Sequence, residues 1–147
     1  MHTGHEIMPL TMNVDAFSDS TLLLRSLTNN SRRPNVLLVC GEGTSDVVVR
    51  HLSRWCGHPV RCSAFPGSLT LPPDRTGTLL LHGVDRMTLA QQIALFDWLS
   101  PEGREGKEAQ GPQIVSMTTA PLEPLVMNGY FLEGLLRRLK IVQLDLA

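Results

Sequence analysis

The sequence has few aromatic residues, little net charge and no long hydrophobic run. Aromatic residues make up 5% of the 147 residues, and 13 Lys and Arg against 14 Asp and Glu give a formal net charge of -1. This balance argues against a strongly basic protein, so we expect no direct DNA binding. No apolar segment approaches the ~20 residues that cross a bilayer, and the N-terminus lacks a signal-peptide pattern. We therefore expect a cytoplasmic protein that does not enter a membrane.

Cysteine is also scarce. Its three occurrences are an odd number with no C-x-x-C spacing, which argues against a disulfide scaffold. A zinc site is the alternative, and its four side chains would be His51, Cys56, His58 and Cys62. Cys56 and His58 lie closer together in the sequence than structural zinc ligands usually do. We expect no metal site, and we expect Cys40, Cys56 and Cys62 to be buried, inert thiols.

The length and the apolar content predict one folded domain. With 147 residues, of which 42% are apolar, the chain is long enough to bury a substantial core. Residues 1–17 show no clear periodicity, so we expect a flexible N-terminal arm there. Residues 18–147 then form a single domain.

Short apolar runs alternate with helical patterns along this domain. The runs are bounded by Gly and polar residues, which is typical of strands buried on both faces. We expect strands at 35–40, 59–63, 78–82, 113–118 and 140–146, and helices within 18–30, from about 44 to 55, at 88–99 and at 129–138. This alternation predicts an α/β fold, a three-layer sandwich with a five-stranded parallel sheet.

A glycine-containing turn follows the first strand and is the first candidate site. Its residues are Gly41, Glu42, Gly43, Thr44, Ser45 and Asp46. Ligands bind at the carboxyl ends of parallel strands, where the N–H groups of such a turn could hold phosphate. Phosphoryl transfer also needs a Lys, and Asp46 stands in its place, where a carboxylate would repel a triphosphate. In a first helical turn Asp46 complements the helix dipole, so we expect a structural turn.

The third strand ends in His82 and Gly83, where a nucleotidase places two carboxylates, one for magnesium and one to polarise water. Asp85 follows shortly afterwards, and we expect it to cap the next helix rather than to bind a metal. His82 has no apparent orienting partner in the sequence, so we do not expect it to be a catalytic base.

Several stretches follow, in order, the motifs of one family. The motif V-L-I-x-G-E-S-G-T-G-K-E is matched by Val36-Leu37-Leu38 and Gly43-Thr44, P-F-V-x-x-N-C-A-A by residues 59–64, and G-T-L-F-L-D-E-I by residues 77–84. The later motifs follow in the same order: L-P-L-x-x-Q-x-x-L-L-R-V-L is matched by residues 89–99, A-A-T-N by 116–119, and L-V-x-x-G-x-F-R-x-D-L-Y-Y-R-L-N-V by 125–141. Over about three quarters of its length, the chain therefore resembles the central AAA+ (P-loop NTPase) domain of bacterial enhancer-binding proteins, the sigma-54-dependent transcription activators.

The resemblance implies a P-loop NTPase core with strand order 5-1-4-3-2 that lacks the residues the family uses to bind and hydrolyse nucleotide. The family's nucleotide-handling residues are replaced by Asp46, His82, Gly83 and Thr119. Residues 63–76 leave no room for the G-A-F-T-G-A loop that grips the sigma factor, so we expect no sigma-factor contact, and the helical lid domain is absent. Arg138 stands at a family arginine. It is either an arginine finger toward a neighbouring subunit or a solvated partner of Arg137 on the polar face of its helix.

Two functions stay open. The first is a non-catalytic regulatory module that binds a protein partner, such as another AAA+ regulator, with neither cofactor nor ATPase activity. The second is a sigma-54-type transcription regulator with residual binding of ATP and magnesium. In that case the backbone amides of 41–44 would hold the phosphates and Arg138 would act on an adjacent subunit.

Overall fold

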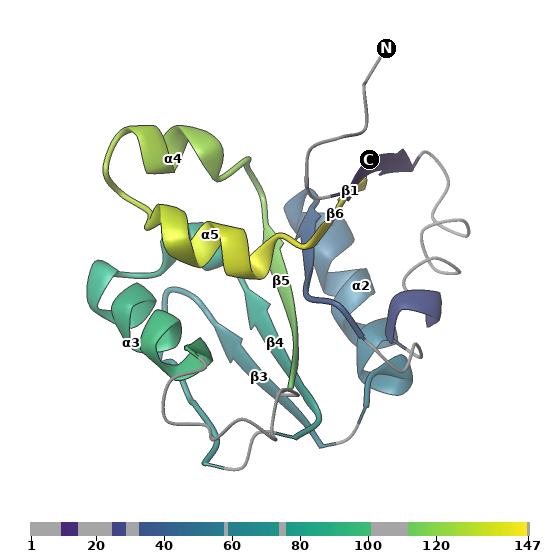
Figure 1. The fold of residues 1–147 in the computed structure, drawn as a ribbon. Helices are drawn as coiled ribbons and strands as arrows, with labels where there is room; N and C mark the ends of the chain where they lie inside the picture. The colour runs from purple at the N-terminus through teal and green to yellow at the C-terminus, as the bar shows by residue number, and fades with distance from the viewer. Residues whose placement is uncertain are drawn as a thin grey trace.

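The computed structural model describes residues 10–14, 25–28, 33–57, 59–73, 76–100 and 112–146. They build one six-stranded sheet in the order β1-β6-β2-β5-β4-β3, in which every neighbouring pair is parallel (Figure 1). The strands are β1 (Leu10–Val14), β2 (Val36–Val39), β3 (Val60–Ala64), β4 (Thr78–His82), β5 (Gln113–Thr118) and β6 (Val142–Leu146). The five expected strands lie in the expected order, so the predicted α/β P-loop NTPase-like fold class is confirmed.

Strand β1 differs from the expectation. Residues 10–14 belong to the segment in which we expected a flexible arm, yet they pair in parallel with β6, with Leu10 opposite Val142. An edge strand such as β6 would otherwise present a row of unpaired N–H and C=O groups, and pairing with β1 satisfies them. The pairing partner is far away in the sequence, which is why local periodicity did not reveal this strand. The rest of 1–17 lies outside the described residues.

Helices cover both faces of the sheet. They are α2 (Glu42–Trp55), α3 (Leu89–Leu99), α4 (Glu123–Met127) and α5 (Glu133–Leu139), with a 3₁₀ turn, η1 (Val84–Arg86), after β4. Helix α2 lies on one face, and α3, α4 and α5 lie on the other (Figure 1). The expected helix at 129–138 is thus shorter and begins later, and α4 was not expected. Of the helix expected within 18–30, the structure describes only residues 25–28, which are helical.

The core consists of two apolar layers, one on each side of the sheet. Along β2, Val36 and Leu38 face the layer that contains α2, whereas Leu37 faces the layer of α3 and α5. Successive strand residues point to opposite faces, so a strand buried on both sides must be apolar throughout. Among the described residues, no helix is long and apolar enough to span a membrane.

Candidate functional site

A pocket of about 310 Å³ opens where strands β3, β4 and β5 end. This carboxyl edge is where ligands bind in parallel α/β sheets. Its lining residues are Asp46, Ala64, Phe65, His82, Gly83, Asp85, Arg86, Met117, Thr118 and Thr119. The pocket therefore brings together four of the residues that the sequence singled out: Asp46, His82, Gly83 and Asp85.

Backbone hydrogen bonds carry the sheet one residue beyond its strand ends and form the wall of the pocket. The Phe65 N–H donates to the His82 oxygen at 2.8 Å, and the Gly83 N–H donates to the Met117 oxygen at 2.8 Å. On the other side, the Cys40 N–H donates to the Thr118 oxygen at 3.0 Å. Each turn is thus tied to the neighbouring strand, so the pocket is held on rigid elements.

The turn between β2 and α2 is much shorter than we expected. Strand β2 ends at Val39 and helix α2 begins at Glu42, so that only Cys40 and Gly41 lie between them. Most of the proposed phosphate-binding turn is therefore helical, and the expected helix start at 44 or 45 was wrong. Gly41 is the N-cap residue, in an extended conformation that residues other than Gly also adopt. Of the turn residues whose side chains the structure describes, Asp46 lines the pocket.

The backbone conformation and its close neighbours favour glycine at residue 83. Its φ of 82° is left-handed, and a Cβ added there would lie 2.8 Å from the main-chain oxygen of Phe65. A side chain at this position is disfavoured both by the dihedral angle and by the contact. The carboxylate that the family resemblance leads one to look for at residue 83 is therefore incompatible with this backbone.

Asp85 does not cap the next helix, contrary to the expectation. It lies inside η1, and α3 is instead capped by Thr88, whose hydroxyl accepts from the Gln91 N–H at 3.1 Å while the Gln91 side chain accepts from the Thr88 N–H. The Oδ1 atom of Asp85 is buried and has no hydrogen-bond partner within the described part of the chain. One oxygen of the Asp85 carboxylate in the pocket wall is thus left without a hydrogen bond from the described residues.

The charged groups around the pocket disfavour a polyanion. Two carboxylates, Asp46 and Asp85, and one guanidinium, Arg86, line it. An ATP phosphate chain would meet more negative than positive charge at short range, in a site partly shielded from water. The half-buried imidazole of His82 lies at the end of β4. This composition is better suited to a neutral or cationic group than to a triphosphate.

Arg86 and Thr118 were not expected as site residues, and Thr119 was expected only as a replacement for a family residue. The Thr118 hydroxyl is already used locally, because it donates to the Ala120 oxygen at 2.7 Å. The signal that could have found Thr118 and Thr119 is their place at the end of a buried strand, beside the end of β4. Arg86 gave no such signal, because its place depends on the short turn η1.

No group of three or more His, Cys, Asp or Glu residues that could hold a metal is present in the described ranges. His51 stacks on the Trp55 ring at 5.6 Å, and His58 lies outside the described residues. Burial raises the pKa of Cys40 and of Cys56 to about 11, so both thiols stay protonated. Cys62, in contrast to our expectation, is exposed.

Arg138 is half-buried and lies at the opposite edge of the sheet. Its Nη1 donates to the Leu99 oxygen at 3.0 Å, and its guanidinium lies 4.9 Å from the centre of the Phe96 ring. The main-chain oxygen of Arg138 accepts from Asn35, just before β2 begins. The expected solvated pairing with Arg137 is wrong, because Arg137 bonds to Glu133 at 2.8 Å instead. The arginine-finger role stays a prediction, and it would require Arg138 to leave both contacts.

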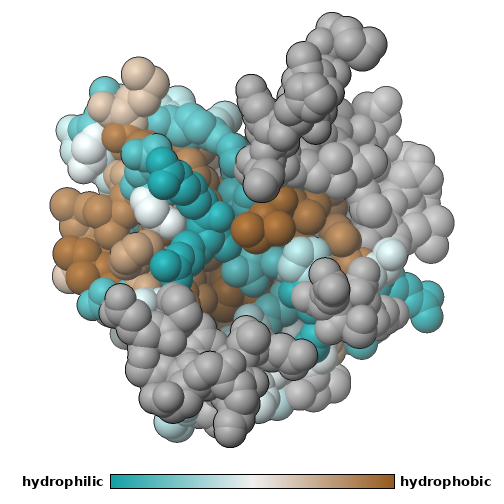
Figure 2. All heavy atoms as spheres, viewed as in Figure 1, coloured by the Kyte–Doolittle hydropathy of each residue, from teal (hydrophilic) through white to brown (hydrophobic). Residues whose placement is uncertain are grey.

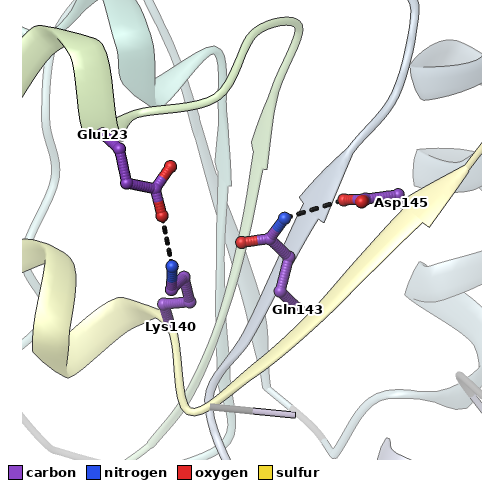
Figure 3. Close-up of polar contacts among 4 residues, drawn as sticks. All are labelled: Glu123, Lys140, Gln143 and Asp145. Carbon is purple, nitrogen blue, oxygen red and sulfur yellow. Dashed lines mark hydrogen bonds and ion pairs between the residues drawn. The ribbon is translucent and has the colours of Figure 1, made fainter. Parts of the chain in front are cut away.

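Two pairs of polar side chains make contacts around β6, apart from the pocket. Lys140, at the end of α5, reaches the Glu123 carboxylate on α4, and the Gln143 amide donates to Asp145 at 2.8 Å (Figure 3). The hydrogen bond from Lys140 holds the pKa of Glu123 below its usual range. The Glu123–Lys140 contact joins α4 to the C-terminal end of α5, whereas the Gln143–Asp145 bond lies within β6, and none of the four residues lines the pocket.

The fold of this chain resembles that of solved structures of another protein. The chain is similar in fold to NtrX from Brucella abortus. The TM-score is 0.67 at 16% identity, covering 88% of this chain and 36% of the NtrX chain. For NtrX in complex with ATP, the TM-score is 0.65 at 18% identity, covering 99% of this chain and 39% of the NtrX chain. For the ADP complex, the TM-score is 0.60 at 19% identity, covering 87% of this chain and 34% of the NtrX chain.

The chain thus spans little more than a third of each NtrX chain. No family model and no curated protein sequence matches it. At these identities the likeness shows the fold alone.

Proposed function

We propose that this chain is a non-catalytic regulatory module with an AAA+-like fold, related to the sigma-54-dependent transcription regulators. It acts in the cytoplasm by binding a protein partner and does not hydrolyse ATP. The observation that carries this proposal is the start of α2 at Glu42, directly after Gly41. Residues that would have to arch around phosphates are part of a regular helix, and Asp46 takes the place of the required lysine.

The other side of the pocket supports the same proposal. A side chain at residue 83 would collide with the backbone of Phe65, so one of the two acids that handle magnesium and water has no place there. The losses at 46 and 83 therefore lie on two different elements.

Nucleotide binding is tested by titrating the intact protein with ATP and magnesium in a calorimeter. We expect no binding up to millimolar ATP. The matched variant is Asp46→Lys, which restores the missing cation. We expect it to remain unable to bind ATP tightly, because the helical backbone at 42–46 is unchanged. Micromolar affinity in either protein would contradict the proposal.

Partner binding is tested with the isolated AAA+ domain of a sigma-54-dependent activator, the partner class that the proposal names. The protein is immobilised, and association is followed by interferometry with and without ATP. We expect saturable binding. A maltose-binding protein of similar concentration serves as the control for non-specific adsorption, and equal signals from both would contradict this part of the proposal.

The second candidate is an ATP-binding sigma-54-type regulator with residual nucleotide binding. One observation favours it: a pocket of about 310 Å³ at the carboxyl edge contains Arg86 and the exposed Thr119. The similar fold of NtrX has been obtained in complex with ATP and with ADP. A rise in melting temperature on adding ATP and magnesium would favour this candidate, because a ligand stabilises the state that it binds. A melting temperature that does not change would favour the first.

A further inference from the structure

The outer face of helix α3 is apolar, although it faces solvent. Leu89 is 48% exposed and Ile93 is 51% exposed, and the side chains beside them on this face, Ala90 and Ala94, are exposed as well. The inner face carries the fully buried Leu95 and the buried amide of Gln92. A surface helix normally carries charged residues along its outer side, whereas here only Asp97, in the last turn, is charged.

A further exposed apolar side chain lies on a loop that contacts α3. The Gln92 amide donates to the Tyr130 oxygen at 3.0 Å, which brings the loop between α4 and α5 next to α3. Tyr130 itself is 67% exposed. In the space-filling view, hydrophobic residues gather over the α3 side of the molecule (Figure 2). Scattered exposed apolar residues need no explanation, but a contiguous patch on one helix marks an interaction surface.

The order of large and small side chains on α3 indicates what covers it. The large residues Leu89 and Ile93 form one row along the helix, and Ala90 and Ala94 form the neighbouring row. When two copies of α3 lie antiparallel with a two-fold axis between residues 91 and 92, Leu89 faces Ala94 of the other copy and Ile93 faces Ala90. Each large side chain then meets a small one, and the two helices can approach closely.

The charge distribution favours the same arrangement. Asp97 lies in the last turn of α3, where the helix dipole disfavours a carboxylate. In the antiparallel arrangement it lies opposite residue 86 of the other copy, just before the first turn of that α3. That turn contains no acidic residue and carries the positive end of the dipole. A parallel arrangement would instead place the two Asp97 carboxylates side by side.

We propose that α3 is a self-association surface, on which a second copy of this chain binds antiparallel through Leu89, Ala90, Ile93 and Ala94. The proposal goes beyond the regulatory function above and does not depend on it, because none of these residues lines the pocket. One helix face buries less than the ~800 Å² per partner of typical stable complexes. We therefore expect a weak dimer whose population rises with protein concentration.

The experiment is sedimentation equilibrium of the full chain from low micromolar to several hundred micromolar concentration. We expect the wild type to shift from monomer to dimer. Ile93→Arg should raise the dissociation constant roughly tenfold or more, because an unpaired charge would be buried at the interface. The matched control is Ile141→Arg, which changes an isoleucine that is 48% exposed and lies just before β6. It should dimerise as the wild type does.

A wild type that stays monomeric throughout would overturn the proposal, and so would equal dissociation constants for the two variants. Circular dichroism and melting temperature confirm that both variants are folded. Since both positions are exposed, neither substitution removes a core contact.

The antiparallel register is tested by disulfide formation in a Cys62→Ser background, in which the remaining cysteines are buried. We expect Leu89→Cys mixed with Ala94→Cys to give a cross-linked dimer under mild oxidation, whereas neither variant does so alone. Cross-linking of Ala94→Cys by itself would indicate a parallel pair and overturn the arrangement. Absence of any cross-link in the mixture, at a concentration where the wild type is dimeric, would also overturn it, because facing residues in a close helix pair come within disulfide reach.

Discussion

Gly83 and Phe65 lie in such close contact that a Cβ on residue 83 would stand 2.8 Å from the Phe65 main-chain oxygen. Gly83 also donates its N–H to the Met117 oxygen at 2.8 Å, so its backbone cannot move away from β5 without losing that bond. The end of β4 is therefore shaped by backbone packing, and the same contact that holds the pocket wall excludes an acidic side chain from it.

We predict that Gly83→Ala destabilises the protein more than Gly129→Ala does. Both glycines have a φ of 82°, but nothing lies within 4 Å of a Cβ at residue 129. The control therefore measures the cost of the dihedral angle alone, about 1 kcal/mol, and the difference between the two variants measures the contact with Phe65. Urea denaturation gives both free energies of unfolding. Equal losses would show that the backbone at residue 65 can move aside.

Arg138→Ala should lower the free energy of unfolding by about 1–2 kcal/mol. The substitution removes the hydrogen bond to the Leu99 oxygen and the contact with the Phe96 ring, which together join α5 to α3. Arg137→Ala is the matched control. Its side chain is 74% exposed and pairs with exposed Glu133, so its effect should stay below about 0.5 kcal/mol. Similar effects of both substitutions in denaturation experiments would argue against a structural role for Arg138.

The Glu123–Lys140 pair makes a small part of the stability dependent on pH. The pKa of Glu123 is lowered in the folded protein, so its contribution is present above the unfolded-state pKa and is lost as the pH falls through the folded value. The Glu123 side chain is 49% exposed, so the effect is small. Between about pH 5 and pH 3, Glu123→Gln should lose less stability than the wild type does. Lys140→Met should behave alike, and an unchanged pH profile in both variants would contradict the assignment.

The three cysteines should react very differently with iodoacetamide in the native protein. Cys62 is exposed, whereas Cys40 and Cys56 are buried, with pKa values raised to about 11. Alkylation proceeds through the thiolate, and partial burial raises the pKa of Cys62 as well, so we expect labelling at mildly alkaline pH to modify Cys62 first and all three cysteines to be modified in denaturant. Mass spectrometry of the intact protein counts the modifications. Early labelling of Cys40 would show that the region where β2 joins α2 opens readily.

The patterns that predicted the sheet are local and strong. Leu79, Leu80 and Leu81 form an uninterrupted apolar run bounded by glycines at 77 and 83, which is typical of a strand covered on both faces, and the structure buries all three. The alternation of such runs with helical patterns then limits the topology. The strand order followed from the family resemblance rather than from the pattern of any single segment.

Other features were missed because they depend on contacts between distant segments. Strand β1 exists through its pairing with β6, at the other end of the chain. Arg138 looked solvated from its helical position, but the Phe96 ring and the end of α3 lie against it. Similarly, Asp85 stood at a suitable distance before a helix, yet the 3₁₀ turn moves the N-cap position to Thr88.

The amino-acid sequence by itself determined the α/β class, the five central strands and the absence of the lysine and of the two acids that handle nucleotide. It did so because burial on both faces requires continuous apolar runs, and because charge at a named position can be read directly. Only the tertiary structure decided that α2 begins directly after Gly41, that a side chain at residue 83 would collide with Phe65, and that α3 exposes apolar side chains. Each of these depends on which backbone atoms and side chains are brought together from distant parts of the chain, and no local pattern records that.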